Sequence, residues 1–230
     1  ARALAGGGRG VPRQGGRGVL VNGFVPWERK NEFKRSFAIV MGQKNQLWWD
    51  LPASDSLYLN KCIYDVDDRE YKKTVDELSE LLGVRELMNI QVRRLSLGER
   101  MKMEILAALI HRPGILFLDE PTIGLDIVSQ QKIRDFLHYY NEQTKTTVIL
   151  TSHYMRDIEA LCSRAVIINS GTLVYDGALS DINHRMGDKR LLTLSFSSPV
   201  ENGKLSVFGR VRENKDLTAV LEIPKERKSN

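Results

Sequence analysis

Apolar residues in the middle of the chain follow two alternating patterns. Residues 37–41 and 115–118 are short apolar runs, and residues 146–151 place Val, Ile and Leu between threonines; we predict that all three are strands buried in a parallel sheet. Between them, residues 67–83 and 127–140 carry apolar side chains at helical spacing, and residues 101–110 are apolar on most sides. Because strands and helices alternate, we predict an α/β fold with a parallel sheet.

Capping residues indicate where these helices begin and end. Asp67 and Gly83 suit the two ends of the first helix, Ser96 with Glu99 has capping-box spacing before the second, and Asp126 can cap the third. The second helix, which stops before residues 113–114, should be deeply buried. One face of the third is lined by Ile133, Phe136, Leu137 and Tyr140.

The remaining segments predict smaller elements on either side of this core. Residues 19–21 form a β-like run before a turn at 22–23, residues 154–162 are helical, and residues 165–175 form a hairpin that turns at Ser170-Gly171. Residues 191–196 and 219–223 alternate like strands. We therefore expect a main domain over residues 19–186, with a helical subdomain at about 50–94, and a partial accessory domain over residues 187–230.

Positive charge is concentrated at the start of the chain. Residues 1–20 hold four arginines and no acid, so they account for most of the formal net charge of +5. A basic surface stripe is not implied for the folded part, and no nucleic-acid partner is expected. Residues 1–18 are rich in Gly and Arg and should be disordered. They are an RGG-like RNA-binding tail, a flexible end, or GC-rich coding sequence read in the wrong frame.

Neither membrane-spanning segments nor cysteine clusters are found along the chain. The apolar runs are shorter than the roughly 18 residues that a spanning helix needs. Cys62 and Cys162 lie far apart without a CxxC or Cys/His pattern, so neither a disulfide framework nor a zinc site is indicated. The default location is a reducing cytosol.

Two short stretches carry candidate chemistry. Asp119 and Glu120 end an apolar run, which would place two carboxylates at the carboxyl edge of a parallel sheet, where Mg²⁺ and an attacking water could be held. Ser96 and Gly98 open a helix whose N–H groups and dipole suit a phosphate. Taken singly, the first could be a strand that ends in solvated acids and the second an ordinary helix cap.

The order of five such positions is what points to a family. Gln43, the Ser96 turn, Asp119-Glu120, Asp126 and His153 resemble the Q-loop, signature, Walker B, D-loop and H-loop of ATP-binding-cassette (ABC) ATPases. The resemblance covers about residues 21–182. The loop of residues 41–50 looks like that of an exporter-type subgroup which works with separate membrane subunits.

The resemblance implies a role for each of these residues. Glu120 would be the general base, Asp119 would bind Mg²⁺ through water, and His153 would contact the γ-phosphate. Gln43 would touch Mg²⁺ and sense the membrane subunit. The last group, Ser96, Gly98, Glu99 and Asp126, would reach the γ-phosphate of ATP held by a second subunit.

The sequence departs from the family pattern in two ways. Leu97 stands where the usual signature has its first glycine, and Glu99 replaces glutamine, although Gly98 is kept. No GxxxxGK[ST] phosphate loop occurs in the 230 residues. We expect a fragment or frameshifted product of a longer cassette, with sheet edges and apolar surface left uncovered, that by itself neither binds nor hydrolyses Mg-ATP.

The resemblance therefore implies a P-loop NTPase-like (ABC ATPase) parallel-sheet core with a helical insertion, N-terminally incomplete, plus a partial β-rich C-terminal extension. The expected protein is the ATPase subunit of a transporter, using ATP and Mg²⁺. Its partners would be polytopic membrane permease subunits and a second ATPase subunit, and it would lie peripherally on the cytoplasmic face of the membrane. The alternatives are a catalytically inactive ABC interaction module and a non-transport ABC ATPase.

Overall fold

The structure is a computed structural model that describes residues 19–186, 189–198 and 200–224. The Gly/Arg-rich segment of residues 1–18 lies outside the described residues. The chain divides after Cys162 into two compact units, which are taken one at a time below. The extension of the main domain to residue 186 stays a prediction.

The first unit is built on a parallel sheet with the order β1-β2-β3. Its strands are β1 (Phe37–Met41), β2 (Ile115–Asp119) and β3 (Thr147–Thr151). Met41, Asp119 and Thr151 are paired in register at the last position of the three strands. The parallel α/β arrangement is confirmed, and whatever follows these strands meets at one edge of the sheet.

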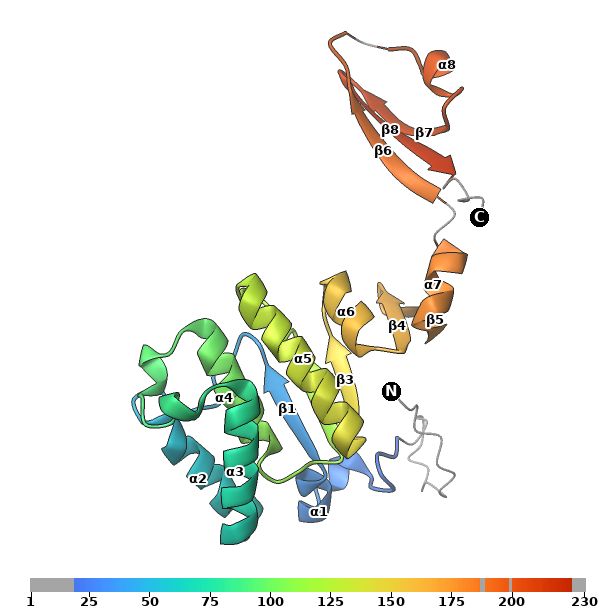
Figure 1. Cartoon of the computed structure of the whole chain (residues 1–230). Coiled ribbons are helices and arrows are strands. Elements are labelled where there is room, and N and C mark those ends of the chain that lie inside the picture. Colours follow the sequence, from blue (N-terminus) through green and yellow to red (C-terminus); the bar gives the residue numbers. More distant parts are fainter. Residues whose placement is uncertain (1–18, 187–188, 199, 225–230) are drawn as a thin grey trace. The chain divides into compact units, whose positions relative to one another are not determined.

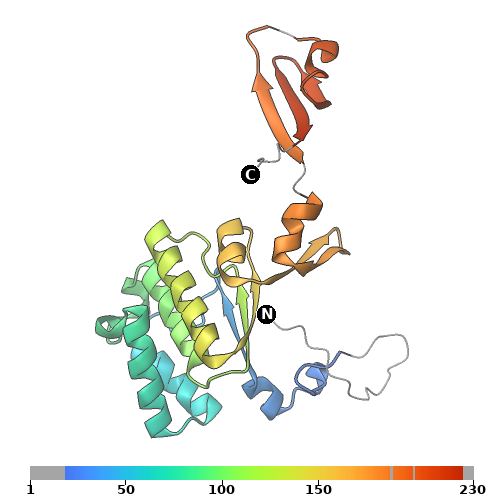
Figure 2. The same ribbon diagram turned by 45° about the vertical axis from the view of Figure 1, so that its right-hand side comes forward.

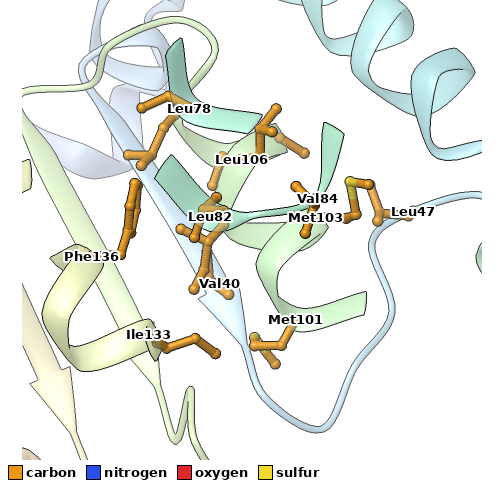
Figure 3. Packing of buried hydrophobic residues seen from close by; sticks show 14 of the residues in the cluster. Val40, Leu47, Leu78, Leu82, Val84, Met101, Met103, Leu106, Ile133 and Phe136 are labelled. Carbon is orange, nitrogen blue, oxygen red and sulfur yellow. The ribbon is translucent and has the colours of Figure 1, made fainter. Parts of the chain in front are cut away.

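Helices cover one face of this sheet (Figure 1 and Figure 2). α4 (Leu97–Leu109) lies against β1, and it packs on α5 (Ile127–Thr144), α3 (Asp68–Leu82) and α2 (Ala53–Tyr64). Residues 101–110 are all buried, as the apolar pattern predicts. Figure 3 shows Val40 of β1 among Leu82, Met101 and Ile133 from three helices. The core of the unit therefore lies between the sheet and α3, α4 and α5.

The other face of the sheet carries a second apolar row. Ile39, Phe117 and Ile149 are neighbours in register, and Ile39 and Ile149 are 38% and 46% exposed. The expectation that residues 146–151 form a buried strand is wrong in this respect, because β3 is the last strand of the described sheet and only its inner face packs on helices. Continuous apolar sequence does not distinguish burial on one face from burial on two.

The predicted helix ends agree with the structure. The Asp67 carboxylate accepts hydrogen bonds from the N–H groups of Arg69 and Glu70, and Gly83 ends α3 in the left-handed conformation. Ser96 and Asp126 cap α4 and α5. The 3₁₀ turns η2 (Arg85–Leu87) and η3 (Val92–Arg94) connect α3 to α4, and α6 (Met155–Leu161) follows β3. Sequence patterns missed two short elements, η1 (Pro26–Glu28) and α1 (Asn31–Arg35).

The second unit begins with the predicted hairpin. β4 (Arg164–Asn169) and β5 (Thr172–Ala178) are antiparallel and turn at Ser170 and Gly171, both with positive φ. After α7 (Leu179–Met186) and around α8 (Asn202–Leu205), the strands β6 (Lys189–Ser195), β7 (Arg210–Lys215) and β8 (Thr218–Pro224) form an antiparallel sheet with the order β6-β8-β7. Strand β7 was not predicted, because its sequence is mostly charged. Among the described residues, no helix is both long and apolar enough to cross a membrane.

Candidate functional site

The carboxyl edge of the parallel sheet brings together the predicted catalytic and metal-binding residues. Gln43 follows β1, Asp119 ends β2 with Glu120 directly after it, and His153 follows β3. Gln43 and His153 are more than a hundred positions apart in the chain, and the paired strand ends bring all four residues to the same edge of the sheet. The parallel sheet therefore assembles the group.

The two acidic residues have different partners. The Thr151 hydroxyl donates a hydrogen bond to Asp119 Oδ1 over 2.5 Å. His153 Nδ1 lies 2.8 Å from Glu120 Oε2, at ion-pair distance but without hydrogen-bond alignment. The Glu120 side chain is 24% exposed and that of His153 is 55% exposed, although Glu120 Oε2 itself is buried. Asp119 is thus held by a hydrogen bond from a neutral donor, whereas Glu120 Oε2 lies close to an imidazole without a hydrogen bond to it.

Gln43 is exposed in the loop after β1 and makes no hydrogen bond among the described residues. Its loop is fixed on either side instead. Upstream, Gly42 N–H donates to the Asp119 carbonyl over 2.8 Å. Downstream, the N–H groups of Gln46 and Leu47 donate to Glu104 Oε1 over 2.8 and 3.3 Å. Burial raises the pKa of the Glu104 carboxyl, against the opposing effect of these two donors. The exposed Gln43 amide remains available to a ligand.

The signature residues form a second group at the N-terminus of α4. Ser96 and Glu99 make a complete capping box, with the Ser96 N–H and hydroxyl both 2.8 Å from Glu99 Oε2. These bonds from Ser96 lower the pKa of Glu99. Glu99, at the position where the common signature has glutamine, therefore stabilises the turn as an ionised cap.

Asp126 belongs to the same corner of the molecule. Its carboxylate accepts from the Ser129 N–H over 2.9 Å and from the Ser129 hydroxyl over 2.6 Å, which lowers its pKa. A Cβ at Gly98 would lie 2.8 Å from Ser129 Cβ and closer still to its hydroxyl. The two helix N-termini of α4 and α5 are therefore in direct contact.

A buried polar cluster, which sequence patterns missed, lies beneath these loops. Asp157 is fully buried and accepts hydrogen bonds from Arg134 Nη1 over 2.8 Å, from the Ser152 hydroxyl over 3.0 Å and from the Thr122 hydroxyl. Thr122 precedes Asp126 in its loop, and Ser152 precedes His153. The cluster thus ties both loops to α5 and α6. An acid in a short helix with exposed polar neighbours gives no sign in sequence that it is buried.

The oxygen groups at the sheet edge suit a hard cation. Asp119 supplies a carboxylate, Thr151 a hydroxyl and Gln43 an amide, the ligand types that Mg²⁺ accepts while keeping several waters. Nowhere in residues 19–186, 189–198 and 200–224 do three His, Cys, Asp or Glu side chains gather as a metal site.

Comparisons with known proteins give the family of the chain. The family profile described as "ABC transporter" matches residues 17–123. The ABC transporter ATP-binding protein NatA of Bacillus subtilis is 34% identical over 71% of this chain and 66% of its own length. The linearmycin resistance ATP-binding protein LnrL of the same organism is 34% identical over 93% of this chain and 68% of its own. The chain thus spans about two thirds of each relative.

Solved structures give the same answer for the fold. One described as the ATP binding subunit of an ABC transporter matches with a TM-score of 0.63 and 25% identity, covering 73% of this chain and 69% of that one. The cbiO1 structure from Clostridium perfringens, at 22% identity and a TM-score of 0.58, shares the fold over 68% of this chain and 66% of its own. The chain belongs to the ABC transporter ATP-binding family.

Proposed function

We propose that the protein acts in ATP hydrolysis as the ATPase subunit of an ABC transporter. The observation that carries the proposal is the placement of Glu120, directly after the β2 carboxylate Asp119 and 2.8 Å from His153 Nδ1. A carboxylate beside a partly exposed imidazole at the ligand-binding edge of a parallel sheet is suited to take a proton from water.

In this proposal the reaction transfers the γ-phosphoryl group of ATP to water. Glu120 orients the water and accepts its proton as the oxygen–phosphorus bond forms and the bond to ADP breaks. His153, 2.8 Å from Glu120 Oε2, would hold the Glu120 side chain and contact the γ-phosphate. Asp119, fixed by Thr151, and Gln43 would hold Mg²⁺. The ion would supply positive charge against the charge that develops on the phosphate oxygens.

The α4–α5 corner would serve a second nucleotide. Ser96, Gly98 and Glu99 lie at the N-terminus of α4, with Asp126 beside them, and helix N-terminal N–H groups favour anions. We assign this corner to the γ-phosphate of ATP held by another ATPase subunit, so that two subunits enclose the nucleotide between them. The proposed partners are that subunit and separate polytopic membrane subunits, with this chain peripheral on the cytoplasmic face.

We infer that transport is directed outward. The support is the exporter-like loop of residues 41–50 and the name of LnrL, a relative linked to linearmycin resistance. Removal of a compound is one route to resistance. Genes for polytopic membrane proteins beside this one would support transport, whereas their absence would favour a non-transport ABC ATPase.

A second candidate is an interaction module that completes the ATP site of a partner without one of its own. The observation that favours it is the α4–α5 corner, which is intact and would act on a nucleotide held by a partner. A GxxxxGK[ST] loop normally supplies the N–H groups and lysine that hold the β- and γ-phosphates, and the 230 residues contain none. We expect calorimetry to find no micromolar Mg-ATP binding to the 230-residue chain, and micromolar binding would contradict this second candidate.

Hydrolysis itself is tested in a chimaera with a strand–GxxxxGK[ST]–helix unit placed before Val19. We expect Mg-ATP hydrolysis that Glu120→Gln lowers on the order of 100-fold or more, because the general base is lost. The control is Glu142→Gln, which changes a half-exposed acid on α5 outside the site and should leave the rate unchanged. The proposal would be overturned by a folded chimaera that binds Mg-ATP and hydrolyses it equally well with and without the Glu120→Gln substitution.

A further inference from the structure

The backbone of Glu120 has an unusual conformation. Its φ is 52°, in the left-handed region that residues with a side chain seldom occupy without support from their surroundings. Part of that support comes from hydrogen bonds. The Glu120 N–H donates to the Thr151 carbonyl over 3.0 Å, and the Ile123 N–H donates to the Glu120 carbonyl over 3.2 Å. The glutamate therefore depends on its neighbours for the direction of its side chain.

Gly42 is the neighbour on the β1 side. Its N–H donates to the Asp119 carbonyl over 2.8 Å, which extends the β1–β2 ladder by one residue. A Cβ at this position would lie 2.9 Å from the Glu120 carbonyl carbon, closer still to its oxygen, and 3.0 Å from Ile123 Cγ2. Two of these are backbone atoms, which cannot turn away as the end of a flexible side chain can.

A side chain at residue 42 would therefore move the Glu120 peptide. The φ of Gly42 is not in the left-handed region, so the requirement for glycine comes from this contact and not from its own conformation. On the opposite side, the Glu120 side chain meets His153 Nδ1 at 2.8 Å. A displaced peptide would carry the carboxylate away from the imidazole.

We propose that Gly42 is a positioning residue for Glu120. Because Gly42 has no side chain, the ends of β1 and β2 lie close together. The Glu120 peptide can then take the position in which its carboxylate contacts His153. The inference rests on the proposed function, which makes the Glu120 carboxylate the general base. Its test needs no nucleotide, so its failure is distinct from failure of the hydrolysis experiment.

The test uses the imidazole resonances of His153 in the 230-residue chain. The reference is Glu120→Ala, which removes the carboxylate and gives the resonance of His153 without its partner. We expect Gly42→Ala to move the His153 signal toward this reference by at least half of the full difference. In a Glu120→Ala background, Gly42→Ala should produce almost no further change, because no carboxylate is left to displace.

The matched control is Gly114→Ala, at the opposite end of the same sheet. A Cβ there would meet the Ser36 carbonyl at 3.8 Å and Asn22 Nδ2 at 3.9 Å, which are ordinary contacts. We expect the His153 signal of this variant to equal that of the parent chain. Circular dichroism compares the folding of all variants.

Should Gly42→Ala fail to fold, the double variant Gly42→Ala with Ile123→Ala gives the Glu120 carbonyl room to shift. It should regain the fold but keep the displaced His153 signal. The proposal is overturned if a folded Gly42 variant keeps the parent signal, or if the shift persists without the Glu120 carboxylate. Loss of folding in both variants would also overturn it, since Gly42 would then serve the fold as a whole.

Discussion

At the scale of single residues, the most demanding feature is the charge buried at Asp157. Its carboxylate is fully buried and depends on Arg134, itself 5% exposed, for charge balance. Two hydroxyls, from Thr122 and Ser152, complete its hydrogen bonds. A buried carboxylate with all its partners is tolerated, whereas one left without its cation is strongly unfavourable.

The variant Arg134→Met should therefore lower the free energy of unfolding by about 3–5 kcal/mol, because it leaves the Asp157 charge buried and unpaired. Urea denaturation followed by circular dichroism measures the change. The control is Arg164→Met, which breaks the partly exposed pair with Asp176 and should cost about 0–1 kcal/mol. An equal loss of unfolding free energy in the two variants would show that burial does not make the Arg134–Asp157 pair more important than the Arg164–Asp176 pair.

At the scale of elements, the helix caps could be predicted from local sequence, whereas most contacts between elements could not. The caps Asp67, Ser96 and Asp126 act on N–H groups two or three residues away, so their spacing alone predicts them. The grouping of Asp119 with His153 came from the resemblance to the ABC family, and parallel strands that end at one edge account for it. The predicted site thus depends on topology more than on local pattern.

Individual side-chain and backbone contacts between elements could not be predicted from the sequence pattern. The approach of Gly42 to Glu120 joins residues far apart in sequence, and no periodicity reports it. The hydroxyl of Thr151 reaches Asp119 only because the register of β2 and β3 pairs these two positions. The strand β7 was missed because the charged pattern of its sequence hides its single packed position, Val211.

The contact between α4 and α5 leads to a prediction at this scale. Gly98→Ala would press a methyl group on Ser129 and should lower the free energy of unfolding by about 1–3 kcal/mol, as overpacking does. In the double variant with Ser129→Gly, part of this loss should be recovered, since the atoms that the methyl group meets are gone. Thermal unfolding of the two single variants and the double variant gives the coupling free energy between residues 98 and 129. Strictly additive changes in the free energy of unfolding would contradict the contact between these two residues.

At the scale of the whole molecule, the unequal faces of the parallel sheet are the main feature. One face packs against α4 and α5, while Ile39, Phe117 and Ile149 form an apolar row on the other. Exposed apolar rows on strands favour association between molecules. We expect the 230-residue chain to self-associate through this face as its concentration rises.

The double variant Ile39→Thr with Ile149→Thr should reduce that self-association, measured by light scattering, while threonine keeps the strand preference. Its free energy of unfolding should change little, because both side chains are already partly exposed. Ile115→Thr is the comparison, since Ile115 is 1% exposed and a buried hydroxyl should cost about 1–3 kcal/mol. If light scattering is unchanged in the double variant, the chain self-associates through a surface other than this face of the sheet.

The α4–α5 corner also bears on how such motifs are searched for. Leu97 is partly exposed, with its side chain over Gly124, so the structure accommodates a large residue at this position. Gly98 is buried against Ser129 and has no room for a methyl group. Of the two central positions of the signature, only the second therefore requires glycine in this structure. A pattern that requires glycine at both would discard this chain, whereas one that weights the second position would retain it.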